Sequence, residues 1–180
     1  MTMTITEALA EIKTINKRLE KKREFVSQFL WRQERIKDPL EKDGGSQETI
    51  KRERQAINDL EERVIKIRRA IQQANDATTV TILEVSRTVS EWLTWRREIA
   101  QNQQKFLAVL RTGIYNMRQE AQKKGLNIAQ NKETISSDND IVVNINEQEL
   151  AKNIERLEEM LGTLDGQLSL KNATVLLTGL

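Results

Sequence analysis

Apolar residues recur every seven positions along two long stretches near the start of the chain. The first stretch runs from Ile5 to Ile36 and the second from Ile50 to Ala74. Spacings of three and four residues place these side chains on one narrow stripe of a helix, which has to be buried against another helix. The predicted stripes consist of Ile5, Ala8, Ile12, Ile15, Leu19, Val26, Phe29 and Ile36, and of Ile50, Ile57, Leu60, Val64, Ile67, Ile71 and Ala74.

Capping and turn residues set the expected ends of these two helices. Thr4 and Glu7 fit a capping box, and the first helix is predicted to reach about Lys37, before Asp38-Pro39. A short glycine-containing linker then leads to a second helix over residues 46–75. Helices joined by a short connection are antiparallel neighbours, so the chain is expected to begin as a helical hairpin.

The middle of the chain changes its hydrophobic period. Residues 79–82 and 87–89 alternate and are rich in β-branched side chains, which predicts a β-hairpin with its turn over residues 83–86. A third helix is predicted to start near Ser90 and to close at Lys123-Lys124-Gly125, where cations meet the negative helix end and glycine can adopt positive φ.

The last third of the chain predicts a loop over residues 126–140, a strand over 141–145, a fourth helix capped by Asn146, and a terminal strand over 173–178. Because an isolated hairpin is marginal in water, we expect the strands to gather into one small sheet. An unpaired terminal strand would offer its edge to another subunit. The stripe of the fourth helix consists of Leu150, Ile154, Leu157, Leu161, Leu164 and Leu168.

The sequence therefore predicts a mainly α fold. We expect antiparallel long-helix hairpins, with four helices in a coiled-coil-like bundle and a small β-sheet built from short strands. Residues 1–76 form the predicted N-terminal helical hairpin. Residues 77–180 contain the hairpin strands, a helix, a loop, a strand, a helix and the terminal strand, all within one continuous domain.

The chain contains neither histidine nor cysteine, which removes many kinds of site. Ser-His-Asp and Cys-His relays, thiolate nucleophiles, disulfides and Cys/His zinc sites are all excluded. We therefore expect no catalytic residues, no metal site and no cofactor. The first residues show no secretory signal and no stretch approaches the roughly 20 apolar residues of a membrane span, so we expect a chain that is neither secreted nor transmembrane.

One aromatic and basic run is a candidate for binding single-stranded nucleic acid. Trp92, Trp95, Arg96 and Arg97 combine rings that stack on bases with guanidinium groups that neutralise phosphates. The alternative is that both tryptophans, three residues apart, share one helix face and pack on the hairpin while the arginines are solvated, and we favour it. The net charge of +2 is too small to indicate a nucleic-acid binder.

Other apolar residues lie off the predicted stripes. Phe25 and Trp31 point to different sides of the first helix, which indicates either burial on several faces or an outward patch that meets a partner. These two readings remain open. The candidate partner contacts are Phe25, Trp31, Trp92, Trp95, Arg96, Arg97, Val175, Leu176 and Leu177.

Three stretches, residues 5–12, 87–98 and 164–174, resemble a group of small helical proteins encoded by bacteriophages and prophages, distantly similar to septicolysin-like proteins. The resemblance implies a virion or virion-assembly component, located in the virion or the host cytoplasm. It implies binding to other phage structural proteins, and the helical stripes add self-association. The alternatives are a single-stranded nucleic-acid-binding module and, more weakly, a membrane-lytic protein, although no membrane-seeking segment supports lysis.

Overall fold

A computed structural model describes residues 2–129 and 134–179, and within them the chain is mainly α-helical, as predicted. The chain divides into two compact units. Unit 1 contains the residues up to Thr78 together with those from Leu168 onward, and unit 2 contains residues 79–167. The last helix, α5 (Glu147–Thr174), contributes residues to both units.

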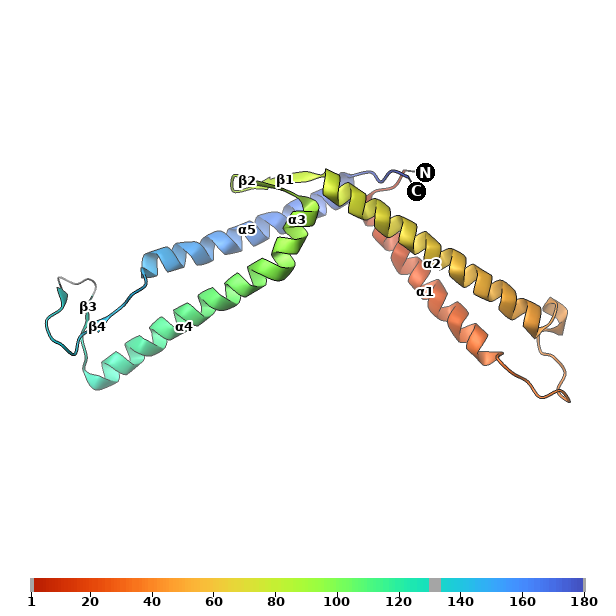
Figure 1. Cartoon of the computed structure of the whole chain (residues 1–180), viewed down its shortest axis with the longest axis horizontal. Coiled ribbons are helices and arrows are strands. Elements are labelled where there is room, and N and C mark those ends of the chain that lie inside the picture. The colour runs from red at the N-terminus through yellow and green to blue at the C-terminus, as the bar shows by residue number, and fades with distance from the viewer. Residues whose placement is uncertain (1, 130–133, 180) are drawn as a thin grey trace. The chain divides into compact units, whose positions relative to one another are not determined.

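Unit 1 is built on a helical hairpin of α1 (Ile5–Gln28) and α2 (Ser46–Ala77), which lie side by side in Figure 1. The predicted stripes meet within one chain. The core consists of Ile5, Ala8, Ile12, Ile15 and Leu19 from α1, Ile67 and Ala70 from α2, and Leu177. Other predicted stripe residues are half-buried, namely Val26, Phe29, Ile50, Ile57, Leu60, Val64, Ile71 and Ala74.

The first helix ends nine residues earlier than predicted, at Gln28 instead of Lys37. The following segment satisfies its polar groups locally, because Arg32 Nη1 donates to the backbone carbonyl oxygens of Glu34 and Ile36 at 3.4 and 3.0 Å. Ile36 is consequently exposed and takes no part in the stripe. A 3-10 turn, η1 (Glu41–Asp43), completes the connection to α2.

The predicted terminal strand over residues 173–178 is wrong. Helix α5 continues to Thr174, whose hydroxyl donates to the carbonyl oxygen of Leu170 at 2.8 Å. Beyond it, a single antiparallel bridge joins Leu176 to Thr4, and the amide of Leu177 donates to the Met3 carbonyl oxygen at 2.8 Å. The chain end therefore packs on its own unit, and Leu177 is buried there.

Unit 2 begins with the predicted hairpin of β1 (Thr79–Ile82) and β2 (Val85–Thr88), which pair antiparallel. The turn of this hairpin is shorter than the predicted turn over residues 83–86, because Val85 and Ser86 pair with β1. Only Leu83 and Glu84 connect the strands, with φ of 44° and 69°. Two successive positive φ values are typical of a type I′ turn, whose twist matches that of the strands.

The predicted third helix is confirmed, with an irregular turn inside it. It comprises α3 (Val89–Thr94), a π-helical turn η2 (Trp95–Ala100) and α4 (Gln101–Lys124). Thr88 and Glu91 form a capping box at its start. Gly125, with φ of 61°, ends it as expected. The sequence gives no indication of the π-helical turn.

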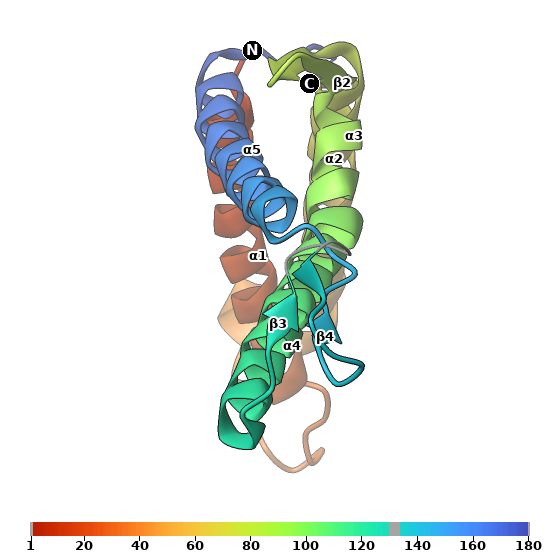
Figure 2. The ribbon, with the colours of Figure 1, turned by 90° about the vertical axis from the view of Figure 1, so that its left-hand side faces the viewer.

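The strands of the chain form two separate sheets in the described residues instead of the single sheet that we expected. The second sheet pairs β3 (Ile128–Ala129) with β4 (Ile141–Val142) in parallel, as Figure 2 shows. The predicted strand over 141–145 is thus shorter. Part of the predicted loop, residues 130–133, lies outside the described residues.

Asn146 caps α5 as predicted, because its Oδ1 accepts from the amides of Gln148 and Glu149 at 3.0 and 3.2 Å.

Candidate interaction surface

Helix α4 has far less buried surface than its length leads one to expect. Ala121 is its one buried residue among 24, whereas α1, of the same length, buries five. The apolar side chains Phe106, Val109 and Tyr115 are exposed, and Leu107, Leu110, Ile114 and Met117 are only half-buried. Because helices in proteins are stabilised mainly by packing of an apolar face, α4 lacks a contact that α1 has.

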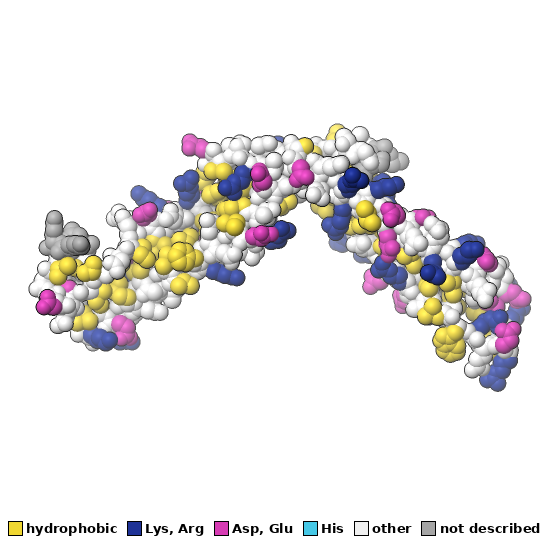
Figure 3. Space-filling view, in the orientation of Figure 1, with side chains coloured by type: hydrophobic (Ala, Val, Ile, Leu, Met, Phe, Trp, Pro, Cys, Tyr) yellow, Lys and Arg dark blue, Asp and Glu magenta, His cyan; other side chains and the backbone are white. Residues whose placement is uncertain are grey.

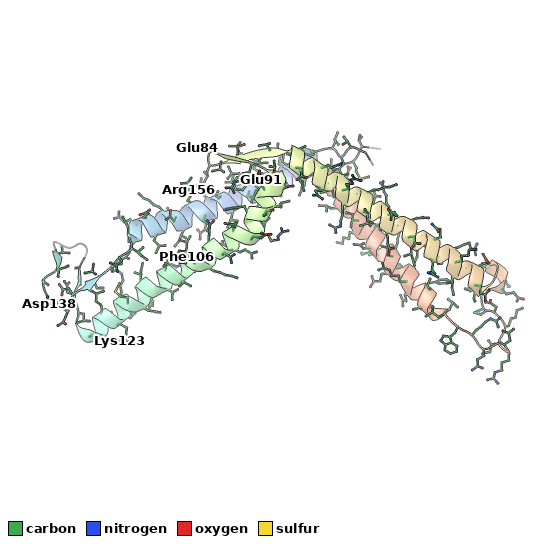
Figure 4. The ribbon with its side chains drawn as sticks, in the orientation of Figure 1. Glu84, Glu91, Phe106, Lys123, Asp138 and Arg156 are labelled. Atoms are coloured by element: carbon green, nitrogen blue, oxygen red, sulfur yellow. The ribbon has the colours of Figure 1, made fainter. Side chains whose placement is uncertain are left out.

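A groove lies between α4 and α5 of unit 2, where Figure 3 shows hydrophobic side chains gathered over the two helices. Its volume is about 290 Å³. Phe106 projects from α4 and Arg156 from α5 (Figure 4). We call this surface the α4–α5 groove and define it by its lining residues Gln103, Phe106, Leu107, Asn153, Arg156, Leu157 and Met160.

Leu107 of α4 and Leu157 of α5 both line this groove. These two residues also line a smaller hollow of about 130 Å³, together with residues such as Arg111 and Glu158. On α5 the predicted stripe is only partly covered: Leu150, Leu157, Leu164 and Leu168 are buried, and Ile154 and Leu161 are half-buried.

One row of residues through the π-helical turn and α4, on the side of Phe106, contains no charged side chain over about four turns. Ile99, Phe106 and Gly113 follow each other at intervals of seven residues and therefore lie nearly above one another. A Cβ atom added to Gly113 would meet no atom within 4 Å. Glycine inside an exposed helix costs about 1 kcal/mol relative to alanine, and nothing within the described chain packs against this position.

The two helices that form the groove have opposite charge. Helix α4 contains five Lys or Arg and one Glu, a net of +4, and residues 147–167 of α5 contain six Asp or Glu and two Lys or Arg, a net of −4. Two ion pairs connect them, Arg118 with Glu147 at 2.6 Å and Arg96, in the preceding π-helical turn, with Asp165 at 2.8 Å. Lys105 and Glu159 make no ion pair within the described part of the chain.

Trp92 and Trp95, two of the candidate partner contacts, are buried. The indole Nε1 of Trp92 donates to the carbonyl oxygen of Val80 at 2.9 Å, and the two rings meet edge to face with centroids 5.4 Å apart. Both tryptophans are therefore packing residues of unit 2. The exposed arginines Arg96 and Arg97 pair with Asp165 and Glu98.

The other candidate contacts lie in unit 1. Phe25 is half-buried, with its ring 4.9 Å from that of Phe29, whereas Trp31 is 79% exposed. In the terminal segment Leu176 is exposed, Val175 is half-buried and Leu177 is buried. Of these residues, Trp31 and Leu176 remain available to a partner.

Asp38 organises the connection beside Trp31. Its carboxylate accepts hydrogen bonds from the amide of Leu40 at 2.9 Å, and from the amide of Ser46 at 2.8 Å and the Ser46 hydroxyl. These bonds stabilise the charged form, the hydroxyl of Ser46 most of all, and lower the pKa of Asp38 to about 2. Ser46 is the first residue of α2, so Asp38 binds the amide at the start of that helix.

Sequence reasoning did not single out the α4–α5 groove as a candidate contact. The heptad spacing of Ile99, Phe106 and Gly113 is the sequence signal for this surface. What the spacing does not reveal is that α5 leaves one side of that helix uncovered.

Comparison of the chain with protein-family models, with curated protein sequences and with solved structures finds no match in any of the three. The resemblance to phage-encoded proteins therefore stays a prediction. Within residues 2–129 and 134–179, no helix has both the length and the apolar character that crossing a bilayer requires. The same residues contain no group of three or more acidic side chains placed to hold a metal ion.

Proposed function

We propose that this chain is a non-enzymatic structural protein that acts by binding other protein chains, copies of itself included, through its helices. The observation that carries the proposal is the packing of α4, which buries Ala121 alone and exposes Phe106 and Val109. An uncharged, apolar helix face beside a groove is the kind of surface that a second helix covers.

The place of such a protein follows from the resemblance of the sequence to phage-encoded proteins. On that basis we propose a virion or virion-assembly component with other phage structural proteins among its partners. Mass spectrometry of particles purified after induction of the encoding phage tests this directly. Finding the chain at a fixed ratio to the major capsid protein supports the assignment, and its absence from both particles and assembly intermediates contradicts it.

Binding of single-stranded nucleic acid gains no support from the described contacts. Trp92 and Trp95 are buried, and Arg96 and Arg97 already pair with acidic side chains. The salt-dependent quenching of tryptophan fluorescence by single-stranded DNA would be the signature of that alternative.

The molar mass of the purified chain, measured by light scattering over a range of protein concentrations at low and high salt, tests self-association. A defined multimer that persists at high salt supports the proposal, because apolar contacts are not screened by ions. A mass of 20.8 kDa, that of one chain, under all these conditions contradicts it.

A further inference from the structure

We propose that the α4–α5 groove of one copy is covered by the same groove of a second copy, with α4 of each copy lying on α5 of the other. The result is a four-helix bundle made from two chains. This inference rests on the proposed function, since it names the partner at the surface that the proposed function uses.

The apolar residues at the groove match each other across such an interface. Phe106 on α4 is 61% exposed, and Leu157 and Met160 line the groove on α5. Packing of two copies brings both sets together and closes the groove of about 290 Å³ from above. Two-fold pairing needs only one kind of surface, because the same patch serves both subunits.

Charge decides which helix lies on which. Two symmetric arrangements bring the grooves together: α4 on α4 of the second copy, or α4 on α5. The first places a helix of net charge +4 on another of +4, whereas the second places it on a segment of −4. The charge distribution therefore favours α4 on α5.

The register within one chain predicts a specific ion pair between copies. Lys105 precedes Leu107 by two residues and Glu159 follows Leu157 by two. Since the ion pairs of Arg118 with Glu147 and of Arg96 with Asp165 show that the helices run antiparallel, Lys105 and Glu159 lie at the same level. A two-fold axis parallel to the helices preserves this level, so Lys105 of one copy lies beside Glu159 of the second copy.

A pair of variants with matched exposure tests which surface is used. Phe106 and Tyr115 are both 61% exposed on α4, and nine residues, or about two and a half turns, place them on opposite sides of the helix. Phe106→Glu is expected to weaken dimerisation of the full chain by about tenfold or more. Tyr115→Glu introduces the same charge and is expected to leave the dimer intact. Circular dichroism shows whether both variants keep their helices.

A charge exchange tests the arrangement of the helices. Lys105→Glu and Glu159→Lys each place like charges together in the proposed dimer, so each variant alone is expected to dimerise more weakly. Mixed in equal amounts, they are expected to form a heterodimer, because every contact then joins opposite charges. Native mass spectrometry with one variant isotope-labelled separates heterodimers from homodimers.

The outcomes separate this inference from the proposed function. A dimer of twice 20.8 kDa that Phe106→Glu disrupts and Tyr115→Glu does not, with heterodimers from the charge exchange, supports both. A stable multimer that is indifferent to Phe106→Glu overturns the groove interface but leaves self-association standing. Disruption by Phe106→Glu without preferential heterodimers overturns the placement of α4 on α5. A monomer at every concentration overturns both.

Discussion

The indole N–H of Trp92 lies 2.9 Å from the backbone carbonyl oxygen of Val80 and donates a hydrogen bond to it, which ties α3 to the β-hairpin. Trp92 is fully buried, and the guanidinium carbon of Arg87 lies 5.0 Å from the centre of its ring. A cation over a tryptophan face adds to the attachment between the helix and strand β2. Trp92 thus packs on the hairpin, which is the reading that we favour from the sequence.

Replacement of Trp92 by phenylalanine is expected to reduce the free energy of unfolding by about 1–3 kcal/mol. The variant loses the donor to Val80 and part of the buried ring. Chemical denaturation followed by circular dichroism measures the change. Trp31→Phe is the control, because Trp31 is exposed and its replacement is expected to change the free energy by less than about 0.5 kcal/mol. Equal effects of the two variants would contradict the packing described for Trp92.

Leu177 and its neighbour Leu176 provide a second matched pair. Leu177 is buried in the core of unit 1, and Leu177→Ala is expected to destabilise the protein by about 2–5 kcal/mol. Leu176 is 57% exposed, and the same substitution there is expected to have little effect. Thermal and urea melts of both variants measure the difference. A silent Leu177→Ala variant would show that the terminal segment does not pack on α1 and α2.

The turn of the β-hairpin contains strain that one substitution can remove. Glu84 has φ of 69°, a conformation that costs a residue with a Cβ atom about 1–2 kcal/mol and glycine much less. Glu84→Gly is therefore expected to raise the free energy of unfolding by up to about 1 kcal/mol, after the larger entropy of glycine in the unfolded chain is subtracted. Glu84→Ala removes the same charge without relieving the strain, so it should not stabilise the protein.

Acid is expected to loosen the connection between α1 and α2. The hydrogen bonds of Ser46 and Leu40 lower the pKa of Asp38 to about 2 from its ordinary value of 3.8. A lowered folded-state pKa contributes stability above the unfolded value, and this contribution is lost as the pH falls from about 4 to about 2. The amide proton shifts of Leu40 and Ser46, followed by NMR, should therefore titrate near pH 2.

Two variants check the origin of that titration. Asp38→Asn should abolish it, because the amide does not ionise in this range. Ser46→Ala should move the midpoint upward, because the Ser46 hydroxyl is the largest cause of the lowered pKa. A midpoint that stays near pH 2 in Ser46→Ala would show that the hydroxyl does not hold the carboxylate.

The parts of the fold that the sequence predicts well are those in which one stripe is buried against another. Ile5, Ile12 and Leu19 recur at intervals of seven, and they form the α1 side of the unit 1 core. The end of α1 at Gln28 was not predictable in the same way. No glycine or proline marks it, the heptad pattern continues through Ile36, and the helix is replaced by local bonds such as those of Arg32 to backbone carbonyls.

The candidate site was harder to predict than the core, because it depends on what a helix leaves uncovered. Phe106 and Leu107 are adjacent apolar residues in the same helix, and the sequence does not show which of them is covered. Only the position of α5, which covers Leu107 more than Phe106, distinguishes them. The terminal strand failed for a related reason: local β-branched composition does not outweigh a helix that already extends to Thr174.

The π-helical turn at Trp95–Ala100 changes the direction in which side chains point along the helix from Val89 to Lys124. A turn of this kind holds one residue more than an α-helical turn, so every side chain after it is rotated by about 100° from where an unbroken α-helix would place it. Trp92, before the turn, donates to the hairpin, whereas Phe106, after the turn, is 61% exposed. The additional residue therefore gives the helix two apolar faces that point in different directions. Deleting it would rotate the side chains after the turn back by about 100°.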